Sequence, residues 1–409
     1  MRILVVSQYF WPEEFRVNEV VEDLVKRGFD VDVLTGKPNY PKGKIFSGYS
    51  AFTKETETYQ GATVYRVPLI PRGNGGGINL ILNYISYAFV ACVLGPFICK
   101  KAYDLIFVVQ LSPVTVALPA ILLKKLFGIP MILWVLDLWP ESISAAGGAK
   151  IPLVNNLIGG LVKWIYANSD QILISSEGFK HSLRLRGVAD QCISYFPNWS
   201  EESGQGKTPS LDNQGLLTQD VPDGFIIMFA GNIGVAQDFE TIIKAMVNIR
   251  SEKEIHWVIL GDGRRFTWLQ DQVRRNKLAH CVHLLGRFPA QAMPAFYKKA
   301  DVLLVSLRRE PVFEYTVPGK IQSYMAGGKP IIASLDGEGA RLIERAGAGI
   351  TCNAQDAHAL TESVLTMYRY SEADRNRMGA QGYEYFIKHF ERNSLMSDLE
   401  EKFNNQIVA

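Results

Sequence analysis

Apolar residues follow two alternating patterns along the chain. Short apolar runs, of which 2–6 is the first, alternate with longer segments in which apolar residues recur at helical spacing. After the first run, Val17, Val20, Val21 and Leu24 lie on one helical face. Strands that are apolar throughout are buried on both faces, and strands separated by helices pair in parallel. The pattern therefore predicts an α/β fold.

The alternation occurs twice, with an interruption at 199–222 that is rich in Ser, Gly, Gln and acidic residues. The predicted strands are 2–6, 30–34, 104–109, 131–136, 171–175 and 192–196, then 225–230, 256–260, 282–284, 302–306 and 331–333. A chain of 409 residues is too long for one ordinary core. We predict two Rossmann-like, doubly wound parallel-sheet domains, 1–200 and 223–385, and a C-terminal helix at 386–409 that packs back on the first domain.

Composition restricts the function classes. The 43 Lys and Arg residues against 41 Asp and Glu give a net charge of +2, which argues against nucleic-acid binding. The five cysteines are scattered, so we expect reduced thiols in a cytosolic protein without a signal peptide. The one Asp-x-Asp, Asp30 and Asp32, lies inside a predicted strand and is interpreted as structural. No metal or other cofactor is predicted.

Glycine turns follow two strands of the second half. Gly231-Asn232-Ile-Gly234 follows strand 225–230, and Gly261-Asp-Gly263 follows the next one. Glycine lets a backbone approach a phosphate, and exposed N–H groups can hold it at the carboxyl ends of the strands, in a cleft between the two sheets. The second turn does not complete GxGxxG, because position 266 is Phe and no ribose-binding acid follows. This weakens a nicotinamide-dehydrogenase interpretation and favours another diphosphate-bearing ligand.

A lysine lies at a predicted helix start. Pro318 suits the first helical turn, and Lys320 lies in that same turn, where the helix macrodipole disfavours a cation. A lysine beside free backbone N–H groups is expected where an anion binds. The alternative is a solvated surface lysine.

The first half offers two acidic positions and a polar loop. Asp137 follows the apolar strand 131–136, and Glu141 lies just beyond it. A carboxylate there would face the cleft, so Asp137 is our first candidate for contacting the reacting group and Glu141 our second. The alternative for Asp137 is a helix N-cap before Ser142. The loop at 7–18 also follows a strand, and its alternative is an ordinary βα connection.

The run 78–98 approaches the roughly 20 apolar residues that span a bilayer, but Asn, Ser, Gly and Pro interrupt it. A second apolar run, 114–127, ends in Lys124 and Lys125. Two hydrophobic helices rimmed by lysine predict a face that dips into the cytoplasmic leaflet. The alternative is a pair of buried helices packed on the sheet.

Several short motifs occur in a specific order along the chain. Phe229-Ala-Gly-Asn-Ile-Gly, Leu260-Gly-Asp-Gly, Leu285-Gly-Arg, Ala300-Asp and Gly328-Lys-Pro-Ile-Ile together resemble the nucleotide half of the family 4 retaining glycosyltransferases, which have the GT-B fold. Ser7-Gln-Tyr-Phe-Trp-Pro-Glu-Glu, Asp137-Leu-Trp-Pro-Glu-Ser and Val317-Pro-Gly-Lys-Ile-Gln-Ser-Tyr-Met-Ala resemble the branch that includes bacterial N-acetyl-L-fucosaminyl transferases of O-antigen and capsule assembly.

The resemblance implies retaining transfer from a UDP-sugar, of an N-acetylated deoxyhexosamine in this branch, to an undecaprenyl-diphosphate-linked saccharide. It implies a cytoplasmic enzyme, peripheral on the inner face of the plasma membrane. For the nucleotide diphosphate it implies Gly231, Asn232, Gly234, Gly263, Arg287, Lys320 and Ser323. For the acceptor side it implies the loop residues Tyr9, Glu13, Glu14 and Arg16. The predicted catalytic group comprises Asp137, Glu141 and Glu314.

One departure concerns the Glu-x7-Glu pair of the wider family. Its second position is Ser323 here, and Tyr315 lies eight residues earlier. Two alternatives therefore stay open. A GT-B-fold UDP-sugar 2-epimerase would need acid/base groups that the scattered histidines do not supply. A non-catalytic, membrane-associated assembly protein with a decayed nucleotide site is favoured by the missing Glu pair.

Overall fold

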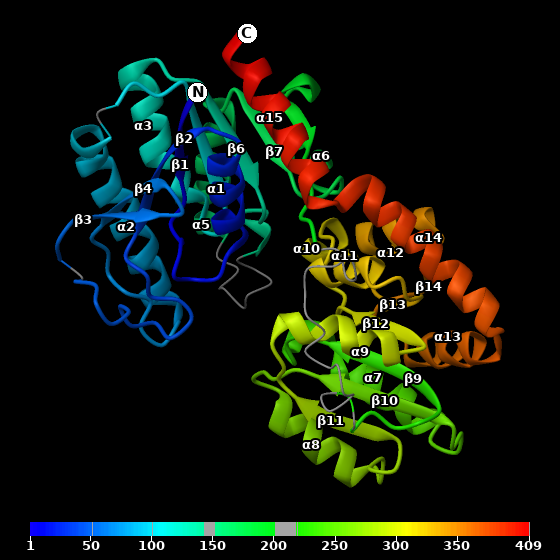
Figure 1. Cartoon of the computed structure of the whole chain (residues 1–409). Helices are drawn as coiled ribbons and strands as arrows, with labels where there is room; N and C mark the ends of the chain where they lie inside the picture. The colour runs from blue at the N-terminus through cyan, green and yellow to red at the C-terminus, as the bar shows by residue number, and fades with distance from the viewer. Residues whose placement is uncertain (51, 100, 143–151, 201–217, 219, 409) are drawn as a thin grey trace. The chain divides into compact units, whose positions relative to one another are not determined.

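Two sheets, each covered by helices, organise the chain in this computed structural model, which describes residues 1–50, 52–99, 101–142, 152–200, 218 and 220–408 (Figure 1). Unit 1 comprises Met1–Pro197 together with Met396–Ala409, and unit 2 comprises Asn198–Leu395. Each unit is built on one mainly parallel sheet covered by helices, so the predicted fold class of two Rossmann-like domains is confirmed. Most of the predicted linker, 201–217 and 219, lies outside the described residues.

The sheet of unit 1 has the order β3-β4-β2-β1-β5-β6-β7-β8. The strands are β1 (Arg2–Val6), β2 (Asp30–Gly36), β3 (Glu55–Tyr59), β4 (Ala62–Val67), β5 (Leu105–Gln110), β6 (Met131–Val135), β7 (Gln171–Ile174) and β8 (Ile193–Tyr195). All neighbours pair in parallel except β3, which runs antiparallel to β4. The sequence analysis missed β3 and β4. The sequence of β3 is ETETY, which is almost entirely polar because this strand lies at the half-exposed edge of the sheet. It therefore lacks the run of apolar residues by which the other strands were predicted.

Helices cover both faces of that sheet (Figure 1). They are α1 (Arg16–Lys26), α2 (Gly77–Ile98), α3 (Ala117–Phe127), α5 (Pro152–Ala167) and α6 (Phe179–Leu185), with short 3-10 turns at Val114–Val116 and Asp190–Cys192. The helix α15 (Arg392–Val408) ends the chain on unit 1, where Phe403 packs edge-on against Phe107 at 5.1 Å. Residues 386–390, which we predicted as part of this terminal helix, belong instead to the preceding helix in unit 2.

The sheet of unit 2 is parallel, in the order β11-β10-β9-β12-β13-β14. Its strands are β9 (Phe225–Ala230), β10 (Ile255–Leu260), β11 (Val282–Gly286), β12 (Val302–Ser306), β13 (Ile331–Ser334) and β14 (Gly349–Cys352). Its helices are α7 (Phe239–Asn248), α8 (Phe266–Arg275), α9 (Met293–Lys299), α10 (Pro311–Tyr315), α11 (Gly319–Ala326), α12 (Glu338–Ala346), α13 (Ala357–Arg369) and α14 (Glu372–Phe390), with 3-10 turns at Val235–Gln237 and Ala290–Ala292. The sequence analysis missed β14.

Alternation along β12 divides the core of unit 2 into two layers. Leu303 and Val305 face one cluster of buried residues, which includes those of α11, while Val302 and Leu304 face the other, which includes those of α7. A strand that is apolar on both faces packs against both layers of the core. The loops that follow β9, β10 and β12 therefore share one edge of the sheet, as the loops after β1, β2, β5 and β6 do in unit 1.

Candidate functional site

The glycine turns of unit 2 pack directly on one another. A Cβ atom at Gly261, whose φ is +137°, would lie 1.9 Å from the carbonyl oxygen of Gly231. A Cβ at Gly263 would lie 2.3 Å from the carbonyl oxygen of Ile233. Both positions lie in backbone conformations that L side chains rarely adopt. These glycines allow the turns after β9 and β10 to interlock.

The N–H groups of these turns are already hydrogen-bonded within unit 2. Gly231 donates to the Leu260 carbonyl at 2.8 Å, and Gly234 donates to the side-chain oxygen of Gln237 at 3.1 Å. Gly263 donates to the Asp262 carboxylate at 2.7 Å. In this conformation these three N–H groups are not free to hold a phosphate, which corrects the reason that we gave for the glycines.

Lys320 lies against the interlocked turns. It is in the first turn of α11, and a Cβ at Gly231 would lie 2.4 Å from its Cε, so the lysine side chain would have to shift if position 231 carried a Cβ. Its Nζ lies 4.5 Å from the centre of the buried Phe229 ring. Among the described residues it has no carboxylate partner, and desolvation lowers its pKa to about 8. The structure thus places an uncompensated cation at a helix start, where an anion is favoured.

The other predicted residues of unit 2 differ in how close they lie to this turn. The side chain of Asn232 lies between the turns, with its Oδ1 only 2.6 Å from where a Cβ of Gly263 would be. The Ser323 hydroxyl shares a hydrogen bond of 3.1 Å with Ser200. Arg287 is exposed, and so is Glu314 on α10. The described contacts bring neither Arg287 nor Glu314 to Lys320.

In unit 1, Asp137 follows β6 and accepts a hydrogen bond from the Ser142 hydroxyl. Its backbone carbonyl accepts from the Gln110 amide at 2.7 Å, which ties the loop to the end of β5. Desolvation raises the pKa of Asp137 to about 6, although the Ser142 hydrogen bond opposes the shift. A perturbed carboxylate at the carboxyl end of a parallel strand is a candidate acid or base. The segment 143–151, which the helix N-cap alternative concerns, lies outside the described residues.

Glu141 is engaged with its own unit. Its Oε1 accepts from Arg186 at 2.7 Å and from the Ser182 hydroxyl at 3.1 Å. Both donors lie on or just after α6, so Glu141 anchors that helix to the Asp137 loop. This arrangement gives it a positioning role and leaves Asp137 as the acidic candidate of the loop.

Glu13 fastens two loops together. One carboxylate oxygen accepts the backbone N–H groups of Asn39 and Tyr40, both at 2.7 Å, and the other accepts the Phe10 N–H at 3.3 Å. The side chain is buried, and this desolvation raises its pKa. Since three backbone N–H groups bind this carboxylate, Glu13 organises the predicted acceptor-side loop.

The other three predicted acceptor-side residues differ in how far they are engaged within the protein. Tyr9 is buried, and its hydroxyl accepts from Arg72 at 3.0 Å. Glu14 is exposed. Arg16 begins α1 and pairs with Glu19 at 3.4 Å. Of the four predicted acceptor-side residues, Tyr9 and Glu13 are therefore held inside the loop structure.

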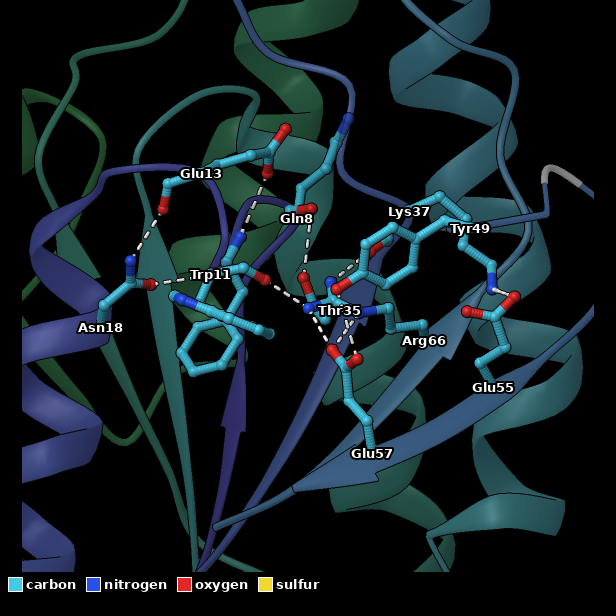
Figure 2. A network of polar contacts seen from close by, with 12 residues as sticks. Gln8, Trp11, Glu13, Asn18, Thr35, Lys37, Tyr49, Glu55, Glu57 and Arg66 are labelled. Atoms are coloured by element: carbon cyan, nitrogen blue, oxygen red, sulfur yellow. Dashed lines mark hydrogen bonds and ion pairs between the residues drawn. The ribbon is translucent and has the colours of Figure 1, made fainter. Parts of the chain in front are cut away.

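Two buried cations of this region escaped the sequence analysis. Arg66 on β4 donates to Glu57 at 2.5 Å, to the Gly36 carbonyl at 3.1 Å and to the Trp11 carbonyl (Figure 2). The fully buried Lys37 pairs with Glu55 at 2.7 Å, and burial lowers its pKa. Both acidic partners lie on β3, a strand that we did not predict, so no sequence pattern connected these charges.

Helix α2 presents two different faces. Its inner face ties loops together: Asn83 accepts from the Gln8 amide at 2.8 Å and donates to the Ile70 carbonyl at 2.7 Å. Its outer face is apolar and exposed, and Ile78 is 76% exposed and Phe89 67%. This outer face comprises Ile78, Ile81, Leu82, Ile85, Phe89, Val93 and Phe97. By length and composition the helix could cross a membrane, although a core helix passes the same test.

The two aspartates of the Asp-x-Asp are both paired. Asp30 pairs with Arg2 at 2.6 Å, and the buried Asp32 accepts from Lys101 at 2.9 Å and from the Tyr103 hydroxyl at 2.7 Å. These contacts support the structural interpretation of the motif. Within the described ranges, no cluster of three or more His, Cys, Asp or Glu side chains could hold a metal ion.

Both units match models of glycosyltransferase domains. Residues 14–199 match the family described as "Glycosyl transferase 4-like domain", and residues 224–369 match the one described as "Glycosyl transferases group 1". The two ranges together cover more than half of the chain. The chain therefore belongs to the glycosyltransferases that these two domain families describe.

Relatives and solved structures agree with this class. The chain is 28% identical over 348 residues to WcaI of Escherichia coli K12, named as a colanic acid biosynthesis glycosyl transferase, covering 82% of this chain and 83% of WcaI. It is 27% identical over 249 residues to the glycosyltransferase WbjE of Pseudomonas aeruginosa, covering 59% of this chain and 61% of WbjE. Sucrose-phosphate synthase of Thermosynechococcus elongatus superposes with a TM-score of 0.76 at 18% sequence identity, over 100% of this chain and 99% of the synthase. Anabaena HepE in complex with UDP superposes with a TM-score of 0.70 at 13% sequence identity, over 99% of this chain and 100% of HepE.

Proposed function

We propose that this glycosyltransferase moves a sugar from a UDP-sugar to a polyprenyl-diphosphate-linked saccharide, with retention, in bacterial surface polysaccharide assembly. The observation that carries the donor side is Lys320 at the start of α11, a desolvated cation that has no carboxylate partner among the residues that the structure describes. A nucleotide diphosphate supplies the negative charge that this position lacks. The solved structures of HepE with UDP and with UDP-glucose support uridine as the nucleoside of the donor.

The acceptor class is inferred from relatives and from α2. WcaI is named for colanic acid biosynthesis, so a surface polysaccharide is the expected product class. Sugars of such polymers are assembled on a lipid carrier, and the exposed apolar face of α2 is suited to lie in the surface of the cytoplasmic leaflet. An N-acetylated deoxyhexosamine is the transferred sugar that the sequence motifs favour.

The chemistry needs charge stabilisation on both substrates. Breaking the bond between sugar and diphosphate places negative charge on the leaving nucleotide, and Lys320 is positioned to stabilise it without rearrangement. Asp137, with its pKa of about 6, is charged at neutral pH and can accept a hydrogen bond from the acceptor hydroxyl or stabilise the positive anomeric centre. A retaining transfer lets the leaving phosphate take the hydroxyl proton on the same face. No resident metal is part of this proposal.

A screen of nucleotide sugars tests the proposal. Purified protein is incubated with UDP-, GDP- and dTDP-sugars and a lipid-diphosphate monosaccharide, and the products are identified by mass spectrometry and by NMR of the new anomeric centre. We expect transfer from a UDP-sugar with the configuration of the donor. UDP binding without any transfer or hydrolysis would support a non-catalytic assembly role. Free UDP-sugar epimerised at C2 would support an epimerase.

Membrane docking is tested separately with vesicles. Ile85→Glu and Phe89→Glu each place a charge on the outer face of α2, so the protein should stop floating with anionic liposomes while its unfolding temperature stays unchanged. Leu185→Glu is the matched control, because Leu185 is equally apolar and 75% exposed but lies on α6. Unchanged flotation of both α2 variants would contradict docking through this face.

A further inference from the structure

An arginine ahead of α2 has its guanidinium held in place by aromatic side chains. Arg72 donates to the Tyr9 hydroxyl at 3.0 Å, and its guanidinium carbon lies 5.6 Å from the centre of the Tyr9 ring and 5.0 Å from that of Tyr40. Its backbone N–H donates to Asn39 at 3.1 Å. A guanidinium stacked in this way keeps a fixed orientation and retains N–H donors for a planar or tetrahedral anion.

Arg72 has no acidic partner among the described residues, unlike the two other arginines Arg66 and Arg186. Arg66 pairs with Glu57, and Arg186 with Glu141, but no described carboxylate lies within ion-pair distance of Arg72. The structure thus keeps a preoriented positive charge uncompensated, which favours a negatively charged ligand.

Two lysines increase the positive charge beside Arg72. Lys42 and Lys44 flank Gly43, whose carbonyl accepts the N–H of Gly73 at 2.9 Å. The contact is so close that a Cβ at Gly43 would lie 1.6 Å from the Gly73 carbonyl oxygen. Both lysines are exposed, and neither has an acidic partner among the described residues. Three cations therefore gather on two touching loops.

The cations near the two ends of α2 differ in whether they have partners within the protein. Beyond its C-terminus, Lys101 pairs with Asp32, and at the end of the adjoining α3 Lys124 pairs with Asp170 while Lys125 lies over the Trp164 ring. At its N-terminus, the loop that carries Arg72 leads directly into the exposed apolar face that begins at Ile78. Phosphates lie at the headgroup level, just above the depth that such an apolar face reaches.

The N-terminal half of α2 is also the half that meets the candidate reacting groups. Tyr84 packs edge-on against Trp139 at 6.2 Å, and Trp139 belongs to the loop that carries Asp137. Next to Tyr84, Asn83 holds Gln8 in the same loop as Tyr9. A phosphate held by Arg72 would therefore lie on the side of unit 1 where an attached sugar can approach Asp137.

We propose that Arg72, assisted by Lys42 and Lys44, binds the diphosphate of the lipid-linked acceptor while the lipid lies along the outer face of α2. This subsite rests on the proposed function, because it assigns a binding role to the acceptor's carrier. The planar guanidinium makes paired hydrogen bonds to phosphate oxygens, which a lysine cannot reproduce.

Kinetics with two acceptors test the subsite. The same acceptor sugar is presented on a polyprenyl diphosphate and on a neutral alkyl chain. Arg72→Gln should raise KM for the diphosphate acceptor about ten- to hundredfold, the range for hydrogen bonds to a charged group, and leave KM for the neutral acceptor and for the donor unchanged. Arg72→Lys should recover part of the loss, and Lys42→Ala with Lys44→Ala should give a smaller rise. An equal loss on both acceptors would mean that Arg72 only holds Tyr9 and Tyr40 in place.

Calorimetry with farnesyl diphosphate separates failure of the subsite from failure of the proposed function, since it needs no transfer. Wild-type protein should bind this probe, Arg72→Gln should lose that binding, and the control Lys125→Gln should keep it. No binding by the wild type overturns the subsite whether or not transfer occurs. Equal weakening of Arg72→Gln on phosphatidylglycerol vesicles and on vesicles that contain undecaprenyl diphosphate would also overturn it, by showing a general headgroup contact.

Discussion

Units 1 and 2 both place loops at the carboxyl edge of a parallel sheet, but they fix these loops by different means. In unit 1 the loops are held by buried charges: Glu13 accepts three backbone N–H groups, and Arg66 reaches two carbonyls and Glu57. In unit 2 they are held by backbone contact between glycines, with Gly261 directly against Gly231. The loops of unit 1 therefore depend on the charge of particular side chains, whereas those of unit 2 depend on the absence of a side chain.

This comparison also separates the groups that are engaged from those that remain for substrates. Glu13, Arg66 and Glu141 are bound by groups of unit 1, so their roles are internal, although the second carboxylate oxygen of Glu141 is buried and has no hydrogen bond among the described residues. Lys320 in unit 2 and Arg72 in unit 1 have no carboxylate partner in the described part of the chain. We therefore expect substitutions of the first group to lower stability and substitutions of the second to lower binding.

The largest effect is expected for Asp137→Asn. It should lower kcat by about 10²- to 10⁴-fold, the range for a positioned proton acceptor, and leave UDP affinity in unit 2 unchanged. Because desolvation raises the pKa of Asp137 to about 6, wild-type activity should fall as pH drops through 6 and the Asp is protonated, and this limb should vanish in the variant. The pH–rate profile of both proteins measures this. Full activity of the variant would remove Asp137 from the chemistry.

Glu141→Gln is the control for that experiment. It breaks the pair with Arg186, so it should lower the free energy of unfolding, and the acidic limb of the pH profile should remain, moved slightly to lower pH because the charge of Glu141 helps to raise the pKa of Asp137. Loss of the acidic limb in this control would show that Asp137 is not the group that titrates.

Gly261→Ala should destabilise unit 2 by about 3 kcal/mol, because a Cβ 1.9 Å from a backbone oxygen adds a collision to an unfavourable φ. Gly286→Ala is the matched control: its φ is +80° but nothing lies within 4 Å of a new Cβ, so about 1 kcal/mol is expected. Urea unfolding of both variants measures the difference. Equal losses would show that strain alone, and not the interlocked turns, decides stability here.

Lys320→Ala should weaken UDP binding about ten- to hundredfold, by loss of hydrogen bonds to a charged group. Its pKa is lowered to about 8, so the cation is present below pH 8 and is lost as pH rises through that value. Wild-type UDP affinity should therefore decline between pH 7 and 9, and the variant should show no such decline. Calorimetry across this range, with the exposed Lys298→Ala as control, checks both expectations. Unchanged affinity in Lys320→Ala would end the proposed donor role.

The smallest effect is expected for Glu13→Gln, at about 1–3 kcal/mol of unfolding free energy, because a neutral amide offers one acceptor atom where the carboxylate offers two. Glu14→Gln, the exposed neighbour, should change stability by less than about 0.5 kcal/mol. Thermal unfolding of the pair measures the gap. Similar stability of both variants would contradict the charge-held loop of unit 1.

The periodicity of the sequence was enough to predict most strands and helices, since runs such as 225–230 and 302–306 are apolar on both faces and match β9 and β12. It was not enough for β3 and β14, whose partly exposed residues carry no such run. The positions of Lys320 and Asp137 at the ends of strands and helices could also be predicted, because chain order alone places residues at that edge.

Two α/β units with polar loops at the edges of their sheets follow from the amino-acid sequence, because burial of long apolar strands leaves few alternatives. Which of those loop residues are engaged follows only from the folded chain. Glu13 and Asn39, or Gly231 and Gly261, meet across the sheet edge, and hydrogen bonds between such distant residues leave no periodic signal in the chain. Within the described ranges neither Lys320 nor Arg72 forms an ion pair, and this too is visible only in the folded chain.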